Sequence, residues 1–410
     1  MSFVPPQEIL ERYASVLVDF ALGGGSGVQP GEVVRVVASE SAKPLYVELN
    51  RAVWRAGGHV IGGYQPDDDK SYNLSRDFYQ SASPAQLEHF SARYLRGLVD
   101  EMDHQISVIA ESDPHALDSV DPARIMRRGE SMRPLLDWRG EKENAGRFSW
   151  TLGLYGTPAM AAEAGMEEGE YWEQIIHACF LDSEDPLARW REVGEQLDET
   201  RRRLNALDIE RLHVEGADVD LWVSLGENRR WLGGRGRNIP SFEIFTSPDW
   251  RGTEGWIYCN QPLYRYGNLV KGIKLTFTNG RVTAASAEEN ERVLSEMIAT
   301  EGADRIGEFS LTDRRFSRIT RFMAHTLYDE NVGGAFGNTH IAVGRSYQDA
   351  YDGDPSEVSE ERWAELGFNN SSVHTDIVST TDRRVTAQLR GGGELVIYSD
   401  GEFRLDDALG

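Results

Sequence analysis

The sequence predicts an α/β N-terminal domain with a largely parallel sheet, followed by an α+β C-terminal domain. Residues 1–205 alternate between amphipathic helical segments and short runs of β-branched residues, and crossover units of that kind build parallel sheets. Residues 206–410 instead carry closely spaced strand signals. With 410 residues, the chain is also longer than one core of ordinary size requires, so two domains with a boundary near residue 205 are expected.

The first half supplies the alternation. The helices expected from apolar periodicity cover residues 7–22, 43–56, 84–102, 122–138, 169–181 and 185–207. The strands expected between the first of these helices are Val33–Val37, His59–Ile61, Gln105–Ala110 and Phe148–Leu152. The glycine-rich stretch at 23–27 follows a helix and lacks a lysine after its last glycine, so we predict no phosphate-binding loop there.

The second half is richer in strands. The expected strands are Leu212–Gly216, Leu221–Leu225, Gly255–Asn260, Ile273–Thr278 and Arg281–Ala285, and helices are expected over 287–299 and 314–326. Every candidate functional residue lies in this half, so the C-terminal domain is the one expected to bind metal.

The clearest candidate site is the run Ser371–Val378, in which β-branched and polar residues alternate as in a half-buried strand. Residues two apart in a strand share a face, so His374 and Asp376 point the same way. An imidazole and a carboxylate at this spacing form a chelating pair. On its own, such a pair is more often a simple hydrogen bond.

Two glutamates lie in similar surroundings. Glu243 stands among strand-forming residues bracketed by Pro240 and Pro248, and Glu308 follows Gly307, which permits another group to approach closely. Both acids are expected to point inward. Read alone, Glu243 could equally be the ion-pair partner of a nearby arginine.

His340 and Tyr347 complete the set. Seven extended residues span roughly 23 Å, so a turn at Gly344 is needed to bring the two side chains to one centre. The six groups together are carboxylates, imidazoles and a phenol, a mixture that binds divalent ions. We therefore predict one shared metal site in a metal-dependent hydrolase, formed by Glu243, Glu308, His340, Tyr347, His374 and Asp376.

The remaining histidines receive no metal role. His325 is predicted near the end of the 314–326 helix, where a histidine commonly interacts with terminal carbonyls. No acid or histidine stands at chelating spacing from the others, which are His59, His89, His104, His115, His177 and His213.

Composition excludes several classes of protein. The net charge of −24 argues against nucleic-acid or anionic-membrane binding. Such acidity, with little lysine, is typical either of a salt-adapted cytoplasm or of a mildly acidic proteome. Cys179 and Cys259 are too few and too far apart for a disulfide framework or a cysteine zinc site. The chain has no long apolar run and no signal peptide, so a cytoplasmic enzyme is expected.

The chain also resembles the thermophilic-type metallo-aminopeptidases, the aminopeptidase T and aminopeptidase S group, almost from end to end. The segments that carry the resemblance are Tyr13-Ala14, 28–32, 218–223, 238–248, 327–331, 340–344 and 370–376. The chain departs from the family pattern at Phe242, where a glycine is usual, and in a longer link over 331–339.

The resemblance implies two divalent metal ions per chain, zinc or cobalt first and manganese or magnesium next. It implies peptide substrates with a free N-terminus and a homodimer. The family's metal-binding acids correspond to Glu243 and Glu308, its first histidine to His340, its active-site tyrosine to Tyr347, and its last ligand pair to His374 and Asp376.

The expected reaction is hydrolysis of the N-terminal peptide bond by a water that two ions activate. Glu308 is expected to bridge the ions, either Glu308 or Glu243 to accept the proton, and Tyr347 to act as a ligand or as a donor to the oxyanion. Two alternatives remain: an inactive metal-binding or assembly protein of the same fold, and a dinuclear amidohydrolase that acts on a non-peptide amide.

Overall fold

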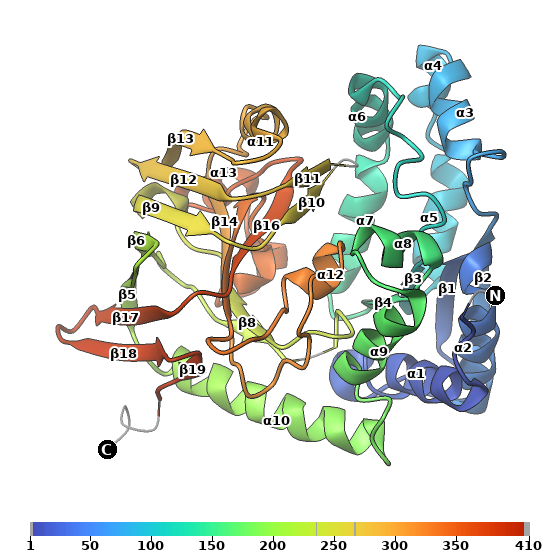
Figure 1. The fold of residues 1–410 in the computed structure, drawn as a ribbon, viewed down its shortest axis with the longest axis horizontal. Helices are drawn as coiled ribbons and strands as arrows, with labels where there is room; N and C mark the ends of the chain where they lie inside the picture. The colour runs from blue at the N-terminus through green and yellow to red at the C-terminus, as the bar shows by residue number, and fades with distance from the viewer. Residues whose placement is uncertain (1–2, 235, 266–267, 406–410) are drawn as a thin grey trace. The chain divides into compact units, whose positions relative to one another are not determined.

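The computed structural model describes residues 3–234, 236–265 and 268–405. The chain divides into two compact units, Met1–Arg191 with Arg235–Pro240 and Glu192–Gly234 with Ser241–Gly410 (Figure 1). The helix α10 (Pro186–Asn205) begins in the first unit and continues into the second. The units divide inside this helix, between Arg191 and Glu192, whereas the sequence placed the domain boundary near residue 205, where the helix ends.

The first unit is built on a four-stranded sheet whose strands all run parallel, in the order β2-β1-β3-β4. The strands are β1 (Val33–Ser39), β2 (His59–Gln65), β3 (His104–Ile109) and β4 (Ser149–Leu154). In β1 the valines at 34 and 36 are fully buried, as expected for alternating β-branched residues. The predicted parallel sheet is confirmed.

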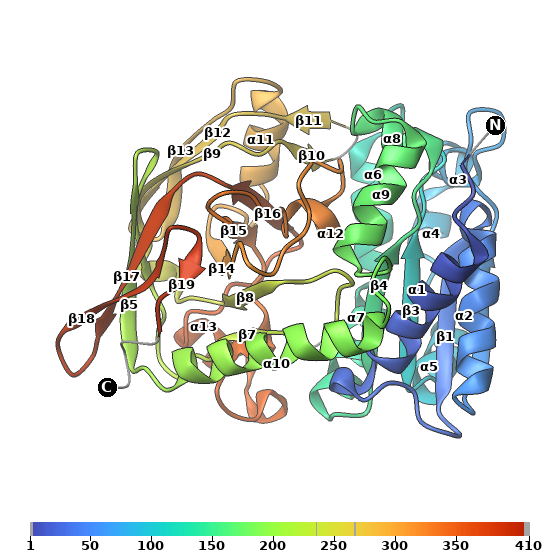
Figure 2. The ribbon, with the colours of Figure 1, turned by 60° about the horizontal axis from the view of Figure 1, so that its bottom comes forward.

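Helices precede, connect and follow these strands (Figure 2). They are α1 (Gln7–Asp19), α2 (Lys43–Arg55), α3 (Leu74–Ser81), α4 (Pro84–Leu87), α5 (Ala92–Glu101), α6 (Pro122–Ser131), α7 (Arg133–Asn144), α8 (Pro158–Glu163) and α9 (Glu168–Ala178). The predictions of single helices over 84–102 and 122–138 are wrong, because each segment forms two helices. In the second case the break falls before Pro134, which has no N–H to continue the preceding helix.

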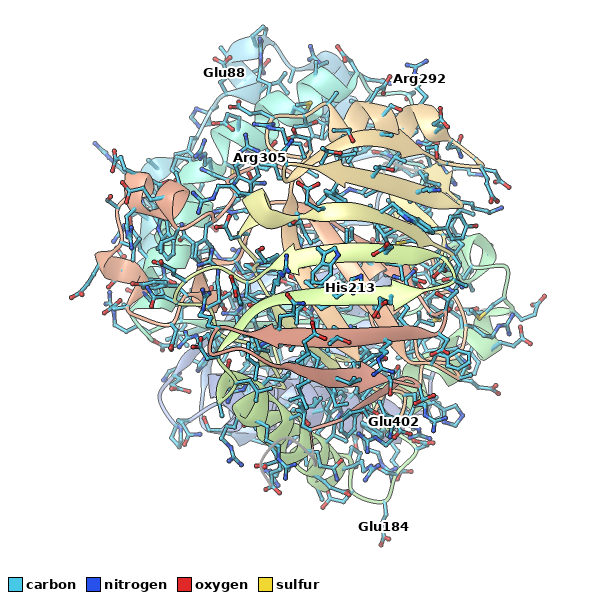
Figure 3. All side chains as sticks on the ribbon, turned by 90° about the vertical axis from the view of Figure 1, so that its left-hand side faces the viewer. Glu88, Glu184, His213, Arg292, Arg305 and Glu402 are labelled. Atoms are coloured by element: carbon cyan, nitrogen blue, oxygen red, sulfur yellow. The ribbon has the colours of Figure 1, made fainter. Side chains whose placement is uncertain are left out.

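The second unit contains an eight-stranded antiparallel sheet in the order β13-β12-β9-β6-β5-β17-β18-β19. Its strands are β5 (Ile209–Gly216), β6 (Val219–Ser224), β9 (Glu254–Cys259), β12 (Ile273–Thr278), β13 (Arg281–Ser286), β17 (Arg383–Leu389), β18 (Glu394–Ser399) and β19 (Glu402–Phe403). Side chains along β6 and β12 alternate between buried and more exposed, so one face meets the core and the other faces solvent (Figure 3).

A five-stranded antiparallel sheet, in the order β16-β15-β14-β8-β7, lies inside this unit. Its strands are β7 (Leu232–Gly233), β8 (Glu243–Thr246), β14 (Ile306–Thr312), β15 (Asn338–Gly344) and β16 (His374–Ser379). Every residue of β14 and β15 is buried. A separate hairpin pairs β10 (Leu263–Arg265) with β11 (Asn268–Val270).

The helices assigned to the second unit alone are α11 (Glu291–Ile298), α12 (Thr326–Asp329) and α13 (Glu360–Glu365). Short 3-10 turns occur at Gly23–Gly25, Glu40–Ala42, Trp250–Gly252, Gln348–Ala350 and Pro355–Glu357. Among the described residues, no helix is both long enough and apolar enough to cross a membrane.

The helix predicted over 314–326 is wrong. These residues are irregular, and α12 begins only at Thr326. Side chains satisfy the backbone here in place of helical bonds: Asp313 accepts from the N–H of Arg315, and Asp329 accepts from the N–H groups of Met323 and His325. Local bonds of this kind compete with helix formation.

Candidate metal centre

Five of the six predicted site residues lie on one face of the five-stranded sheet. In its ladders Glu308 pairs with Ala342 and Ala342 with Asp376, so these three side chains share a face. The neighbouring pairs Gly344–His374, Ser310–His340 and Thr312–Glu243 bring the other groups to the same face. The small side chain of Ala342 lies between the carboxylates of Glu308 and Asp376.

The five groups approach within a few ångströms of one another. His340 Nε2 lies 3.2 Å from both Glu243 Oε2 and Glu308 Oε1. His374 Nε2 lies 3.7 Å from Glu308 Oε2 and 3.5 Å from Asp376 Oδ1. Two sets of three possible metal ligands result, Glu243–Glu308–His340 and Glu308–His374–Asp376, each with ligand atoms within 4.8 Å. Glu308 belongs to both sets.

Burial and like charges raise the pKa of the shared carboxyl. Glu308 is 3% exposed, and its burial, followed by the charges of Glu243 and Asp376, raises its pKa to about 7. Buried carboxylates this close together are unfavourable unless positive charge compensates them. Carboxylate and imidazole ligands are those that divalent ions such as zinc accept, so the residues fit such ions.

The pKa values of the two imidazoles are also raised, which for a histidine favours the charged form. Burial favours the neutral ring of His374, but the charge and hydrogen bond of Asp376, the charge of Glu308 and the bond to the Arg345 carbonyl together outweigh burial and raise the pKa of His374 to about 9. Burial likewise disfavours charge on His340, while hydrogen bonds to Glu243 and Glu308 raise its pKa well above the ordinary value. Burial opposes ionisation of Asp376, but the positive charge of His374 holds that pKa below the ordinary value. Metal ions would have to displace the imidazole protons.

Tyr347 borders this cluster. Its ring centroid lies 4.7 Å from that of His374 and 5.8 Å from that of Phe245. Tyr347 is 37% exposed, yet desolvation of its hydroxyl, followed by the charges of Glu308 and Asp376, raises the pKa of the phenol well above its ordinary value.

Two glycines allow this geometry, as the sequence suggested. Gly344 has a φ of +105°, and a Cβ there would lie 2.0 Å from the carbonyl oxygen of Val373. A Cβ on Gly307 would lie 2.3 Å from the carbonyl oxygen of Arg345. Side chains at either position would therefore push the ligand-bearing strands apart.

Glu330, which received no role from the sequence, lies within electrostatic range of the cluster. This residue is 7% exposed, and its burial, followed by the charges of Glu243 and Asp376, raises its pKa well above the ordinary value. The available signal was the polar run Asp329-Glu330-Asn331 directly after apolar Leu327-Tyr328. From the sequence, that run contributed only to the family resemblance.

His325 lies outside both ligand sets, but the predicted reason was wrong. His325 is the N-cap of α12 and so lies at the start of a helix, not near the C-terminal end of one: its Nδ1 accepts from the N–H of Leu327 at 3.2 Å. Burial lowers the pKa of His325 to about 4, so the ring is neutral and able to accept.

Several other histidines do have carboxylate partners, although the sequence suggested none. Nitrogen–oxygen distances are 2.8 Å for His104–Glu32, 2.9 and 3.0 Å for His115 with Asp118 and Glu163, 2.7 Å for His177–Asp182 and 2.8 Å for His213–Asp220. His213 lies on the outer face of the eight-stranded sheet, stacked on Trp222 (Figure 3). Within the described ranges, no further set of three possible ligands meets the distance criterion satisfied at the metal centre.

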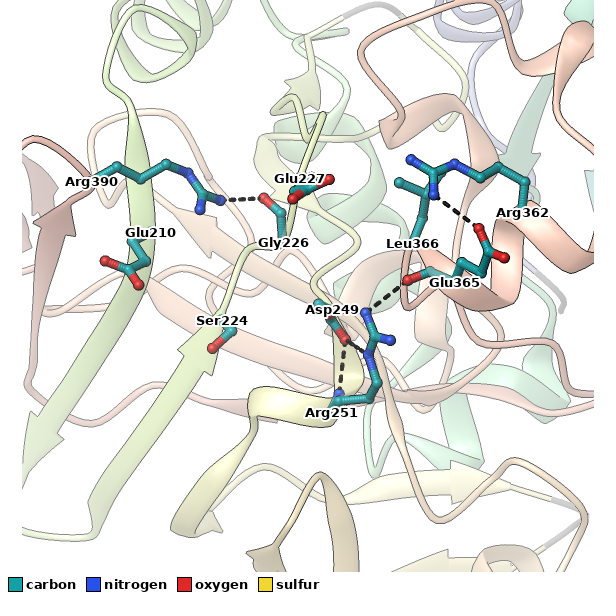
Figure 4. Close-up of a pocket in the computed structure, with 10 residues that line it drawn as sticks. All are labelled: Glu210, Ser224, Gly226, Glu227, Asp249, Arg251, Arg362, Glu365, Leu366 and Arg390. Atoms are coloured by element: carbon teal, nitrogen blue, oxygen red, sulfur yellow. Dashed lines mark hydrogen bonds and ion pairs between the residues drawn. The ribbon is translucent and has the colours of Figure 1, made fainter.

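A separate cavity of about 310 Å³ is lined by arginines and acids of the second unit (Figure 4). Arg251 is paired with Asp249 at 2.6 Å and Arg362 with Glu365 at 3.0 Å. None of the six predicted site residues lines this cavity.

Comparison with known proteins supports the same assignment. A profile of the thermophilic metalloprotease family (M29) matches residues 6–403. The aminopeptidase T of Thermus thermophilus is 31% identical over 394 residues, which cover 90% of this chain and 92% of the relative. The solved structure of wild-type AmpT from Thermus thermophilus aligns with a TM-score of 0.80 at 26% identity, covering 97% of this chain and 99% of that one.

A 2,5-dihydroxypyridine dioxygenase from Pseudomonas putida is alike in fold alone, with a TM-score of 0.52 at 12% identity over 97% of this chain and 96% of that one. The family match spans nearly the whole chain and confirms the resemblance drawn from the sequence. The chain therefore belongs to the thermophilic metalloprotease family and is a hydrolase.

Proposed function

We propose that this chain is a metal-dependent aminopeptidase that releases N-terminal amino acids from peptides at a dinuclear centre. The observation that carries the proposal is the pair of ligand sets that share Glu308. A single ion needs only three or four protein ligands, whereas two sets with one common carboxylate suit two ions.

Glu243, Glu308 and His340 would hold one ion, and Glu308, His374 and Asp376 the other. Zinc and cobalt are the first choices, and manganese or magnesium are compatible with the carboxylates. When bound, such ions lower the pKa of a water and take up charge from the scissile carbonyl.

The chain's own side chains supply the rest of the reaction. Glu308 or Glu243 accepts the proton of the attacking water, and the hydroxyl of Ser310 holds the Glu243 carboxylate by a 3.2 Å bond to Oε2. Tyr347, whose ring packs against that of His374, would donate to the oxyanion or act as a further ligand.

Recognition of a free N-terminus follows from the excess of carboxylates. Glu243, Glu308, Asp376 and Glu330 are all buried, so the centre attracts a substrate's α-ammonium group. Holding that group orients the first peptide bond, and this positioning converts weak binding into catalysis.

A pair of peptides identical except for N-terminal acetylation tests the proposal. Metal-loaded protein should remove single residues in turn from the free peptide and leave the acetylated one intact, as read by mass spectrometry. Internal fragments from either peptide would contradict the aminopeptidase assignment but leave a metallohydrolase. Two intact peptides would favour the inactive or non-peptide alternatives.

The homodimer and the cytoplasmic location expected from the sequence belong to the same proposal. Light scattering coupled to size exclusion tests the first, and fractionation of the source cells tests the second. A monomer that still releases N-terminal residues would remove the dimer from the proposal without affecting the chemistry.

A further inference from the structure

Asn338 is the first residue of β15 and lies two positions before His340, on the same face of the strand. We propose that Asn338 is a positioning residue for the metal centre, fixing the His340 ring so that Nε2 is the nitrogen offered to an ion. The inference rests on the proposed dinuclear centre. Asn338 is 1% exposed, so it acts through protein contacts and not through solvent.

The orientation of the Asn338 amide follows from its acceptors. Its Nδ2 donates to the carbonyl oxygens of Glu330 at 2.7 Å and Val332 at 2.9 Å. If the amide were turned over, its oxygen would face two other oxygens, and neither could donate a hydrogen bond. The amide oxygen Oδ1 must therefore point the other way, toward His340.

That orientation fixes the proton on the imidazole. Asn338 Oδ1 lies 3.4 Å from His340 Nδ1, and an amide oxygen only accepts hydrogen bonds, so Nδ1 carries a hydrogen. His340 Nε2 is then the nitrogen that can give up its proton, and it faces Glu243 and Glu308 at 3.2 Å. Hydrogen bonds to the outer nitrogen of a ligand histidine set both its tautomer and its ring orientation.

His374 provides an internal comparison. Its Nδ1 donates to the backbone carbonyl oxygen of Arg345 at 2.8 Å, an acceptor that no side-chain substitution removes. The orientation of the His340 ring depends on a side-chain acceptor, whereas that of the His374 ring depends on a main-chain acceptor. A substitution at Asn338 should therefore weaken one metal position and spare the other.

The same amide also ties down the backbone of residues 330 and 332, so a control for simple loss of structure is needed. Asn369 provides it. It is 3% exposed, and its Nδ2 donates to the carbonyl oxygens of Gly302 at 2.7 Å and Gly344 at 2.5 Å. Its Oδ1, however, accepts from Arg305 at 3.1 Å and faces no imidazole.

The experiment compares metal binding in the full-length wild type and in the variants Asn338→Ala, Asn338→Asp and Asn369→Ala. Each metal-free protein is titrated with Zn²⁺ against a competing chelator, and its melting temperature is measured alongside. In Asn338→Ala, one zinc equivalent should bind ~10–100-fold more weakly and the other within ~3-fold of wild type. Asn369→Ala should melt earlier but keep both affinities.

Asn338→Asp separates orientation from backbone support. A carboxylate oxygen still accepts from Nδ1 but cannot donate to the two carbonyls, so this variant should melt early yet bind zinc more tightly than Asn338→Ala at the affected position. In the zinc-loaded wild type, the His340 ring should show a protonated Nδ1 and a metal-bound Nε2 by ¹⁵N-correlated NMR. This last measurement needs no variant to fold.

Three results would overturn the inference: metal bound at Nδ1 of His340, both zinc affinities unchanged in Asn338→Ala, or equal weakening of both positions there. Equal zinc binding by Asn338→Asp and Asn338→Ala would also overturn it, because Asn338 would then act only by holding the backbone of residues 330 and 332. These outcomes leave the aminopeptidase proposal standing if the wild type binds two zinc ions and trims peptides. A wild type that binds fewer than two would end both.

Discussion

The two units bury charge in opposite ways. In the first unit, Lys142 is buried, and its ammonium donates to three backbone carbonyl oxygens at 2.8–3.0 Å, those of Val99, Asp100 and Met102. These carbonyls lie at the end of α5, where a cation is favourable. The three donors of the ammonium group each have an acceptor, so this charge is compensated within the fold.

In the second unit, the metal centre gathers carboxylates around two imidazoles. Glu308 and Glu330 both have raised pKa values, because burial and neighbouring acids disfavour their charged forms. The fold holds them together although it does not compensate their charge fully. A buried charge whose hydrogen bonds are all made within the fold, as for Lys142, therefore indicates a structural role. A cluster in which buried acids outnumber their positive partners, as around Glu308, indicates a binding site for a positively charged ligand.

Substitution of Glu308, the carboxylate common to both ligand sets, should give the largest effect. Glu308→Gln should lower peptidase turnover by more than ~10³-fold, because a single oxyanion donor is worth ~10²–10³-fold and this change disturbs both ions. The metal-free variant should be at least as stable as wild type, since one repelling charge is removed. Steady-state kinetics and thermal melts measure the two effects.

Lys142→Met is the matched control in the first unit. It should destabilise the protein by about 1–3 kcal/mol, because buried carbonyls lose their donor, while activity per folded molecule is kept. If Glu308→Gln were destabilised and active while Lys142→Met was stable and inactive, the contrast between the two regions would be reversed.

Tyr347→Phe should give the next largest effect. If the phenol only donates to the oxyanion, turnover should fall by ~10²–10³-fold with metal content unchanged. If it is a ligand, metal content should fall as well. Elemental analysis beside kinetics distinguishes the roles, and a fully active, fully loaded variant would remove Tyr347 from the site.

Metal removal should reveal the uncompensated charge as a pH effect. Without metal, Glu308 and His374 bind protons more tightly in the folded state than in the unfolded chain, since both pKa values are raised. The stability from Glu308 is present below its ordinary pKa and lost as pH rises through about 7, and that from His374 is lost as pH rises through about 9.

Bound ions replace these protons, so the melting temperatures of the metal-loaded and metal-free proteins should diverge as pH rises from 6 to 9. At free metal near ~100 times the dissociation constant, each site adds about 2.7 kcal/mol. Thermal melts at fixed free metal measure the gap. If the difference in melting temperature between the metal-loaded and metal-free proteins became smaller as pH rises, uncompensated carboxylate charge could not be its cause.

The smallest effect on activity is expected from substitution of His325. This histidine precedes the proposed ligand His340 by a short stretch of sequence, but its ring only caps the helix α12. His325→Ala should cost about 1 kcal/mol through loss of the cap on α12 and leave turnover unchanged. The check is a melt paired with a rate measurement on the folded fraction. An inactive variant of normal stability would mean that the ring has a chemical role.

Sequence reasoning worked best where geometry is local. The shared face of His374 and Asp376 follows from strand periodicity, and the tight packing at Gly307 and Gly344 follows from the absence of a side chain. It failed where tertiary contacts decide: the helix predicted over 314–326 gave way to side-chain bonds from Asp313 and Asp329.

Glu330 and Asn338 show a second limit. Their roles depend on which carbonyls and imidazoles face them across the fold, and no spacing along the chain encodes that. The split of the ligands into two sets was equally hidden, because it depends on the register between β14, β15 and β16.

That register has a further consequence for how the enzyme meets its environment. Glu243, Glu308, His340, His374 and Asp376 are fixed by backbone ladders of four adjacent strands, so their spacing does not depend on an ion to organise it. If the proposed centre binds divalent ions, one ion could leave and another enter without refolding of the chain. The working metal would then follow the supply of free divalent ions around the protein, and the enzyme's speed would report that supply.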